Sequence, residues 1–301
     1  MAFFKRHSRR GSYDLFSTYS YCVPGTGGMF MLFLMFLIGA VLGSLIVSVM
    51  AFVSADFVMM YGTVISYPVM FIPPLLYASA QSRRNEFFET GYALDSNHFG
   101  SLGGFRMALT VSVMTMATAF MADTLNLILP PTPEWFDTTM EQLMQGPVWV
   151  TLLSVSVFAP LFEEWLCRGL VLRGLLQKMG PAAAISVSAI FFAVLHMNPW
   201  QALPAFILGL IFGYVYYKTG SLKLTMLMHC VNNTMAVVFS KIPSLADADN
   251  FTEVLSPWAY SGIFIACAAF TAAAFVVLRN IPFAKDGARS NCDEIPAMTI
   301  D

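Results

Sequence analysis

The stretch EEWLCR, residues 163–168, places three ionisable side chains inside an apolar segment that covers residues 148–176. A charged side chain near the centre of a membrane-spanning helix costs about 2.5–3.5 kcal/mol on insertion scales. Glu164 and Arg168 are four residues apart on one helix face, so they can neutralise each other. Glu163 points about 100° away from them and has no partner on its own helix. We therefore predict that Glu163 is the working carboxylate of a functional site.

The composition of the whole chain is that of an integral membrane protein. Of 301 residues, 57% are hydrophobic and only 11% are charged, whereas soluble domains carry about 25% charged residues. Apolar segments of membrane-spanning length cover residues 29–53, 57–80, 104–129, 148–176, 182–198, 201–217, 222–241 and 257–279. The sequence predicts an all-α polytopic protein with about eight transmembrane helices in a lipid bilayer.

The charges of the connecting segments predict the orientation in the membrane. Arginine and lysine gather in the second, fourth and sixth connections and in the C-terminal tail, whereas the third and seventh connections carry acidic residues. By the positive-inside rule, we expect a multi-pass protein of the cell membrane with both termini in the cytoplasm. The net charge of −2 and the lack of a basic stripe in the sequence do not favour nucleic acid as a partner.

Two histidines, His196 and His229, are embedded in predicted spanning segments. Phe192 lies one turn before His196, and Asn233 lies one turn after His229, each on the face of its histidine. Polar residues in a bilayer gather because each is costly alone. We therefore expect both histidines to converge with Glu163.

Helix lengths support this convergence. Glu163 and His196 are each about 16 residues from the turn at 179–181, which is about 25 Å along a helix. They would lie at the same height in an antiparallel hairpin. His229 reaches this height if the hairpin extends about 11 Å further into the cytoplasm than the turn at 219–221. The site is then predicted to be a polar cavity that opens toward the cytoplasmic side.

Three motifs carry a family resemblance. Glu-Glu-x-x-x-Arg (163, 164, 168), Phe-x-x-x-His (192, 196) and His-x-x-x-Asn (229, 233) occur in this order. They resemble the motifs of the CAAX-protease and bacteriocin-processing (CPBP) family of intramembrane proteases, as does the stretch Thr-Gly-Ser-Leu at 219–222. The resemblance covers residues 145–240, and the preceding half of the chain is similar only in its apolar helices.

The resemblance implies an endopeptidase that cuts membrane-associated or lipid-modified proteins or peptides within or near the membrane. It makes Glu163 the general base that activates water. It also implies that Glu164 and Arg168 hold the shape of the site. His196 and Asn233 would orient the water and stabilise the oxyanion, and His229 would complete the polar cluster. Phe192 is a candidate substrate contact, although core packing is the commoner role for such a residue.

The resemblance leaves the cofactor open. Glu163, His196 and His229 would supply three ligands to a catalytic zinc and leave a position for water. Against zinc, the sequence has no HExxH pairing, asparagine is a poor zinc ligand, and no carboxylate is evident behind the histidines. A mechanism that uses the glutamate without a metal is the alternative.

The predicted organisation has four parts. They are a basic cytoplasmic segment (1–28), the first transmembrane helices with a cytoplasmic, amphipathic loop at 81–103 (29–145), a protease-like core (146–242), and the last transmembrane helix with a cytoplasmic tail (243–301).

Two other classes of function use the same polar cluster. One is a noncatalytic membrane scaffold or bacteriocin-immunity-type protein, which the intact motif set disfavours. The other is a transporter, which the lack of a repeat between the chain halves disfavours.

Overall fold

A computed structural model describes residues 26–84, 94–97, 99–176, 178–246, 248 and 250–281. Most of these residues lie in helices and none of them lies in a strand, so the predicted all-α fold is confirmed. The helices are α1 (Thr26–Ala51), α2 (Ala55–Arg84), η1 (Gly100–Leu102), α3 (Gly103–Asp123), η2 (Thr124–Ile128), α4 (Glu134–Gln145), α5 (Val148–Thr151), η3 (Leu152–Phe158), α6 (Ala159–Glu164), η4 (Trp165–Leu172), α7 (Arg173–Leu175), α8 (Pro181–Leu195), α9 (Pro199–Thr219), α10 (Leu222–Phe239), α11 (Pro243–Ala246) and α12 (Pro257–Arg279).

Within the described residues, six helical segments are long and apolar enough to cross a membrane. They are α1, α2, η1 with α3, the continuous rod from α5 to α7, α9 and α12. The remaining two predicted segments are also helices, but α8 has only 15 residues and α10 carries polar side chains such as His229 and Asn233. The chain is polytopic, as predicted, and the count of eight spans stays a prediction.

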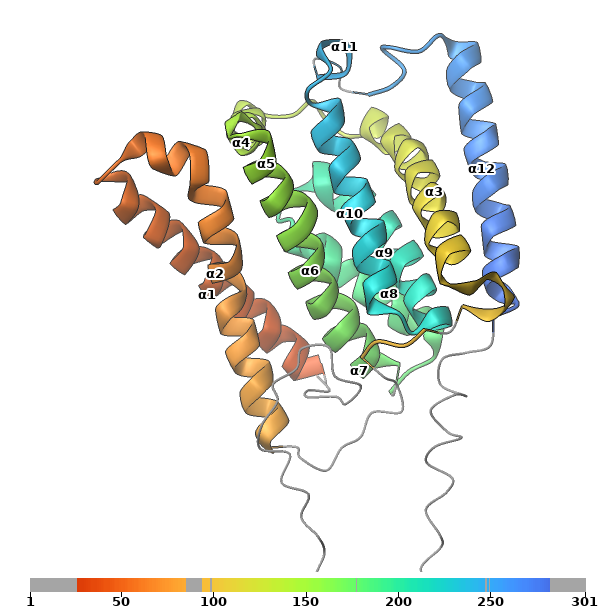
Figure 1. Ribbon diagram of the computed structural model, residues 1–301, viewed down its shortest axis with the longest axis horizontal. Helices are drawn as coiled ribbons and strands as arrows, with labels where there is room; N and C mark the ends of the chain where they lie inside the picture. Colours follow the sequence, from red (N-terminus) through yellow and green to blue (C-terminus); the bar gives the residue numbers. More distant parts are fainter. Residues whose placement is uncertain are drawn as a thin grey trace, which may run out of the picture.

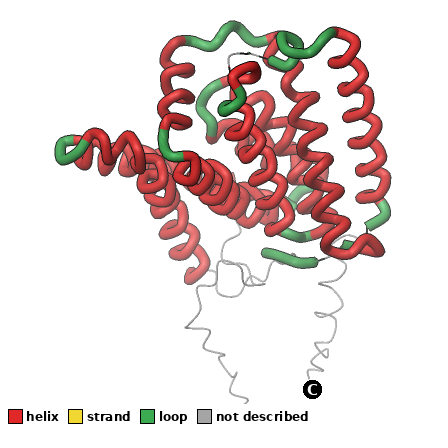
Figure 2. The backbone as a smooth tube through the Cα atoms, turned by 45° about the horizontal axis from the view of Figure 1, so that its top comes forward, coloured by secondary structure: helices red, strands yellow, loops and turns green. Residues whose placement is uncertain are grey.

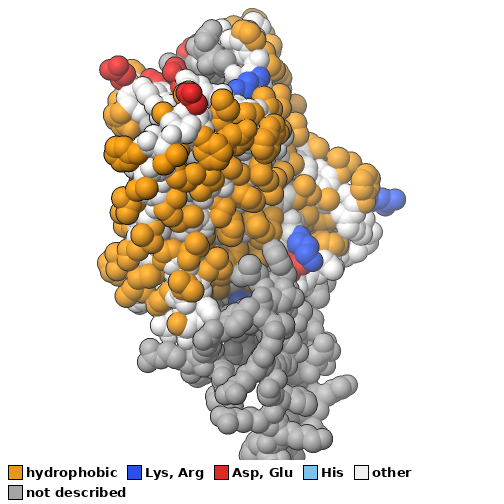
Figure 3. Space-filling model, turned by 60° about the vertical axis from the view of Figure 1, so that its left-hand side comes forward, with side chains coloured by type: hydrophobic (Ala, Val, Ile, Leu, Met, Phe, Trp, Pro, Cys, Tyr) orange, Lys and Arg blue, Asp and Glu red, His pale blue; other side chains and the backbone are white. Residues whose placement is uncertain are grey.

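The surface of the helix bundle suits a lipid environment. Large hydrophobic side chains are exposed along most of the long helices, for example Phe30 (67%), Phe105 (83%) and Ile265 (68%). Figure 3 shows them covering most of one face, below an upper edge with acidic side chains. Soluble monomers rarely expose apolar patches of more than a few hundred Å².

The α1–α2 hairpin lies beside the main bundle and diverges from it at the upper end (Figures 1 and 2). Aromatic rings join the lower part of the hairpin to the bundle, because Phe71 of α2 stacks on Phe162 of α6 with ring centroids 5.1 Å apart. Phe36 of α1 packs against the edge of Phe71. The hairpin therefore reaches the same helix that carries the two glutamates.

The central rod, from α5 to α7, is one continuous helix with two wider stretches, η3 and η4, of π-helical winding. Pro160, near the start of α6, has no N–H to give to the preceding turn. In that turn, the Ala159 N–H donates to the carbonyl of Ser154, five residues back. The next acceptor in this register, the carbonyl of Val155, therefore loses its helical donor at Pro160.

The described part of the predicted 81–103 loop is tied to the turn between α9 and α10. The backbone N–H of Ser96 donates to the carbonyl of Gly220 (2.8 Å), and Asp95 pairs with Lys223 (2.8 Å). Residues 94–97 are not helical. The rest of the predicted amphipathic part, residues 85–93 and His98, lies outside the described residues, as do the predicted terminal segments 1–25 and 282–301.

Candidate active site

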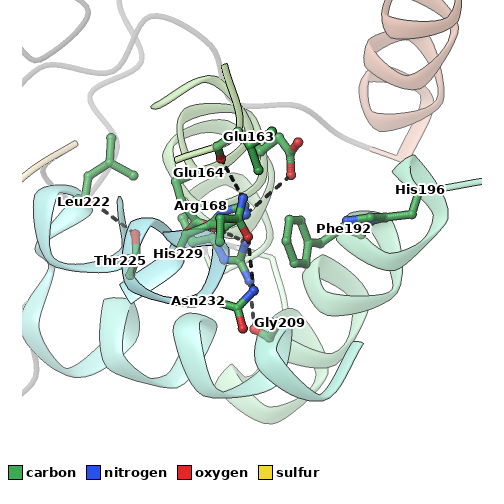
Figure 4. A network of polar contacts seen from close by, with 12 residues as sticks. Glu163, Glu164, Arg168, Phe192, His196, Gly209, Leu222, Thr225, His229 and Asn232 are labelled. Carbon is green, nitrogen blue, oxygen red and sulfur yellow. Dashed lines mark hydrogen bonds and ion pairs between the residues drawn. The ribbon is translucent and has the colours of Figure 1, made fainter. Parts of the chain in front are cut away.

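The predicted site residues lie on three parts of the bundle. Glu163 and Glu164 end α6, and Arg168 follows in η4. In Figure 4, Arg168 and the imidazole of His229 from α10 point toward the glutamates, and Phe192 of α8 separates this group from His196. The sequence therefore predicts the gathering of most of these residues correctly.

The predicted ion pair between Glu164 and Arg168 forms. Arg168 Nη1 donates to Glu164 Oε1 at 2.8 Å, and both side chains are fully buried. Arg168 Nη2 donates to the carbonyl of Gly209 in α9 at 3.0 Å. The guanidinium also lies over the Phe192 ring, 4.6 Å from its centroid, where a cation is attracted to the aromatic face. This arginine therefore holds three helices around the site.

His229 is oriented by the same carboxylate. Its Nδ1 lies 3.1 Å from Glu164 Oε1, and a carboxylate oxygen only accepts, so Nδ1 carries the hydrogen. The rings of Phe192 and Phe212 flank the imidazole at 5.4 and 5.9 Å between centroids. In the neutral imidazole, the lone pair is therefore on Nε2.

Glu163 uses its two oxygens differently. Oε1 accepts a hydrogen bond from the hydroxyl of Tyr67 in α2. Oε2 is buried without a hydrogen-bond donor among the described residues and lies 4.0 Å from Nε2 of His229. The Glu163 side chain is 13% exposed, whereas Glu164 is fully buried. Of the two glutamates, only Glu163 thus has an exposed part of its side chain, and its Oε2 lies just inside the protein surface.

His196 lies outside the hydrogen-bonded cluster. Its Nδ1 lies 3.1 Å from the carbonyl of Phe192, and its ring contacts the Phe192 ring with centroids 5.2 Å apart. The helix ends here because Met197 takes a positive φ of 53° and Asn198 caps α9 through its side chain. The predicted convergence is thus seen for Glu163 and His229, whereas the Phe192 ring lies between them and His196.

Phe192 itself is 3% exposed. Its ring packs against Arg168, His196 and His229 at once. This burial favours a packing role over the predicted contact with substrate.

Asn233 satisfies the carbonyl that Pro160 frees. Its Nδ2 donates to the carbonyl of Val155 at 2.7 Å, and its Oδ1 accepts from Asn232 Nδ2 at 3.0 Å. One amide hydrogen is therefore engaged by the central rod, and the other is available for a further acceptor.

The described side chains are not arranged to form the zinc site that Glu163, His196 and His229 would make if a metal were used. Three ligands would have to converge on one point at about 2 Å. No group of three or more His, Cys, Asp or Glu side chains is so placed in the described parts of the chain. His196 is separated from Glu163 and His229 by the Phe192 ring (Figure 4).

Tyr67 is the contact that sequence reasoning missed. A tyrosine within a membrane span needs a partner for its hydroxyl, and this need was the only signal available in the sequence. Nothing in the spacing of residues on α2 indicates that the partner is Glu163, 96 positions later.

Comparison with known proteins supports the motif assignment. Residues 145–235 match a family model described as "Rce1-like: Type II CAAX prenyl endopeptidase Rce1-like". Searches of curated proteins and of solved structures gave no match. The match confirms what the three motifs predict: over residues 145–235, the chain is similar to the Rce1-like endopeptidases of the CPBP family.

Proposed function

We propose that this protein is an intramembrane endopeptidase that hydrolyses membrane-associated or lipid-modified proteins in the manner of a CAAX prenyl protease. The observation that carries the proposal is the pair of facing atoms, Glu163 Oε2 and His229 Nε2, 4.0 Å apart among apolar helices. The Rce1-like match over residues 145–235 supports the class of substrate.

The two facing atoms can bind the attacking water. A water at about 2.8 Å from each atom would donate one hydrogen to Glu163 Oε2 and the other to His229 Nε2. Glu163 takes a proton as the water oxygen bonds to the carbonyl carbon of the substrate. It then gives that proton to the leaving nitrogen as the carbon–nitrogen bond breaks.

The remaining motif residues support this step in different ways. Asn233 is suited to donate to the oxyanion, because only one of its two amide hydrogens is bonded to the Val155 carbonyl. A preorganised donor of this kind contributes about 2.7–4 kcal/mol. His196 donates from Nδ1 to a carbonyl, so its neutral Nε2 accepts a hydrogen bond. Because the Phe192 ring lies between His196 and the water-binding pair, His196 is suited to orienting substrate. Glu164 and Arg168 hold His229 and the surrounding helices in place.

Cleavage of a defined substrate tests the proposal. The protein is reconstituted in liposomes with a peptide that ends in a prenylated CAAX box, and the released C-terminal fragment is measured by mass spectrometry. We expect wild-type protein to release the fragment and empty liposomes to release none. The same peptide without the prenyl group measures how far the lipid contributes to recognition. Absence of cleavage of both peptides, and of membrane-peptide extracts, would favour the scaffold alternative.

The same liposome preparation tests whether the activity requires a metal ion. Because the described side chains form no three-ligand cluster, we expect turnover to continue in the presence of a strong chelator. Loss of turnover with recovery on adding zinc would instead show that His196 and His229 act as ligands in the working enzyme.

We also propose that the protein lies in the cell membrane with both termini in the cytoplasm and the site accessible from that side. The beginning of α1 and the end of α12 lie at the same end of the bundle in Figure 1. The charge pattern of the connections favours the cytoplasm for this end.

Cysteine labelling tests the orientation. Single cysteines replace the exposed residues Lys178, Thr138 and Thr252 in a variant that lacks the five native cysteines. In intact cells, an impermeant thiol reagent should label positions 138 and 252, and position 178 should react only after the membrane is opened. If position 178 alone were labelled in intact cells, the orientation would be the opposite of the one proposed.

A further inference from the structure

Tyr67 connects the N-terminal helices to the candidate site. It lies in α2, outside the segment that matches the Rce1-like model. Its hydroxyl donates to Glu163 Oε1, and its ring packs against Phe71 with centroids 5.7 Å apart. Phe71 in turn stacks on Phe162, the residue before Glu163. The tyrosine is therefore held by the same aromatic contacts that join α2 to α6.

This contact selects the orientation of the carboxylate. The terminal torsion of a glutamate is broad and roughly two-fold, so it does not fix the carboxylate plane by itself. The Tyr67 hydroxyl engages Oε1, and Oε2 is then the oxygen that faces His229 Nε2. Glu164 holds the imidazole from the opposite side through Nδ1. The two partners of a bridging water are thus fixed by groups behind them, one from α2 and one from α6.

We propose that Tyr67 is a positioning residue for Glu163, so that α2 completes the catalytic unit. The proposal rests on the proposed function, in which Glu163 activates water. Tyr67 touches neither the water nor the substrate and acts through the carboxylate. The N-terminal hairpin then has a role in the reaction that the resemblance over residues 145–235 does not include.

Tyr67→Phe tests the proposal because it removes only the hydroxyl and keeps the ring in contact with Phe71. A hydrogen bond to a charged group is typically strong enough for its loss to reduce kcat by about 10- to 100-fold. KM and the melting temperature should stay near their wild-type values. Tyr61→Phe is the matched control: Tyr61 also lies on α2, its ring contacts Phe57 and Trp149, and its hydroxyl has no hydrogen bond among the described residues. This control should keep wild-type kcat.

Two further measurements separate a positioning role from a structural one. In the Glu163→Gln background, Tyr67→Phe should cause little further loss of activity, because residues that act through one group are not additive. Infrared difference spectra should show that the carboxylate stretch assigned to Glu163 shifts in Tyr67→Phe and not in Tyr61→Phe. The infrared result does not depend on peptidase activity, so it tests the contact even if the proposed function fails. Wild-type kcat and an unshifted carboxylate band in Tyr67→Phe would overturn the proposal.

Discussion

Glu163→Gln is expected to lower peptide hydrolysis by at least the 10²–10⁴-fold that general-base catalysis contributes. Glutamine preserves the side-chain shape and can still accept the hydrogen bond from Tyr67 through its carbonyl oxygen. It cannot take a proton from water at neutral pH. Initial rates in liposomes with the prenylated peptide measure the effect.

The stability of Glu163→Gln should barely change, because Glu163 is not part of the buried ion pair between Glu164 and Arg168, and glutamine keeps an acceptor for the Tyr67 hydroxyl. A melting curve in detergent checks that lost activity is not lost folding. Wild-type rates in this variant would show that another group is the base, and His229 would be the next candidate because its Nε2 faces the same space.

Glu164→Gln should behave in the opposite way, with a large loss of stability. It leaves Arg168 charged and fully buried, and removing one partner of such a pair costs about 3–5 kcal/mol in the free energy of unfolding. Unfolding by a denaturing detergent, followed by circular dichroism, measures the loss. His229 would also lose a charged acceptor at Nδ1, so activity should fall together with stability.

The double variant Glu164→Gln/Arg168→Met is the matched control for this explanation. It removes both charges and replaces the arginine by an unbranched apolar side chain. We expect it to regain part of the lost stability, because no unpaired charge is left in the bilayer. Equal loss in the single and double variants would show that the Arg168 contacts with Gly209 and Phe192, and not the charge balance, stabilise this region.

The sequence was most informative where the physical rule is local. Four-residue spacing is enough to pair Glu164 with Arg168 on any helix, and runs of apolar residues are enough to locate the helices. Glu163 and His229 could be brought together from the cost of isolated polar groups in a membrane. None of these inferences required knowledge of how the helices pack.

The parts that sequence reasoning missed depend on tertiary geometry. Equal helix lengths put His196 at the height of Glu163, but they could not show that the Phe192 ring would stand between them (Figure 4). The partner of Tyr67 could not be predicted from the sequence either, because it depends on how α2 packs against α6. Pro160 could have signalled an open carbonyl in the central rod, although not that Asn233 would bind it.

The hydrogen bond between Asn233 and the Val155 carbonyl fixes the position of α10 along the central rod, and the four-residue spacing of the His-x-x-x-Asn motif then sets the position of His229. Four residues of helix, about 6 Å at 1.5 Å per residue, separate the amide anchored on the central rod from the imidazole that faces Glu163. Sliding α10 by one residue would turn His229 by about 100° and take Nε2 away from Glu163. Any residue other than proline at position 160 would restore a competing N–H for Val155. Positions 160 and 233 should therefore vary together among relatives of this chain.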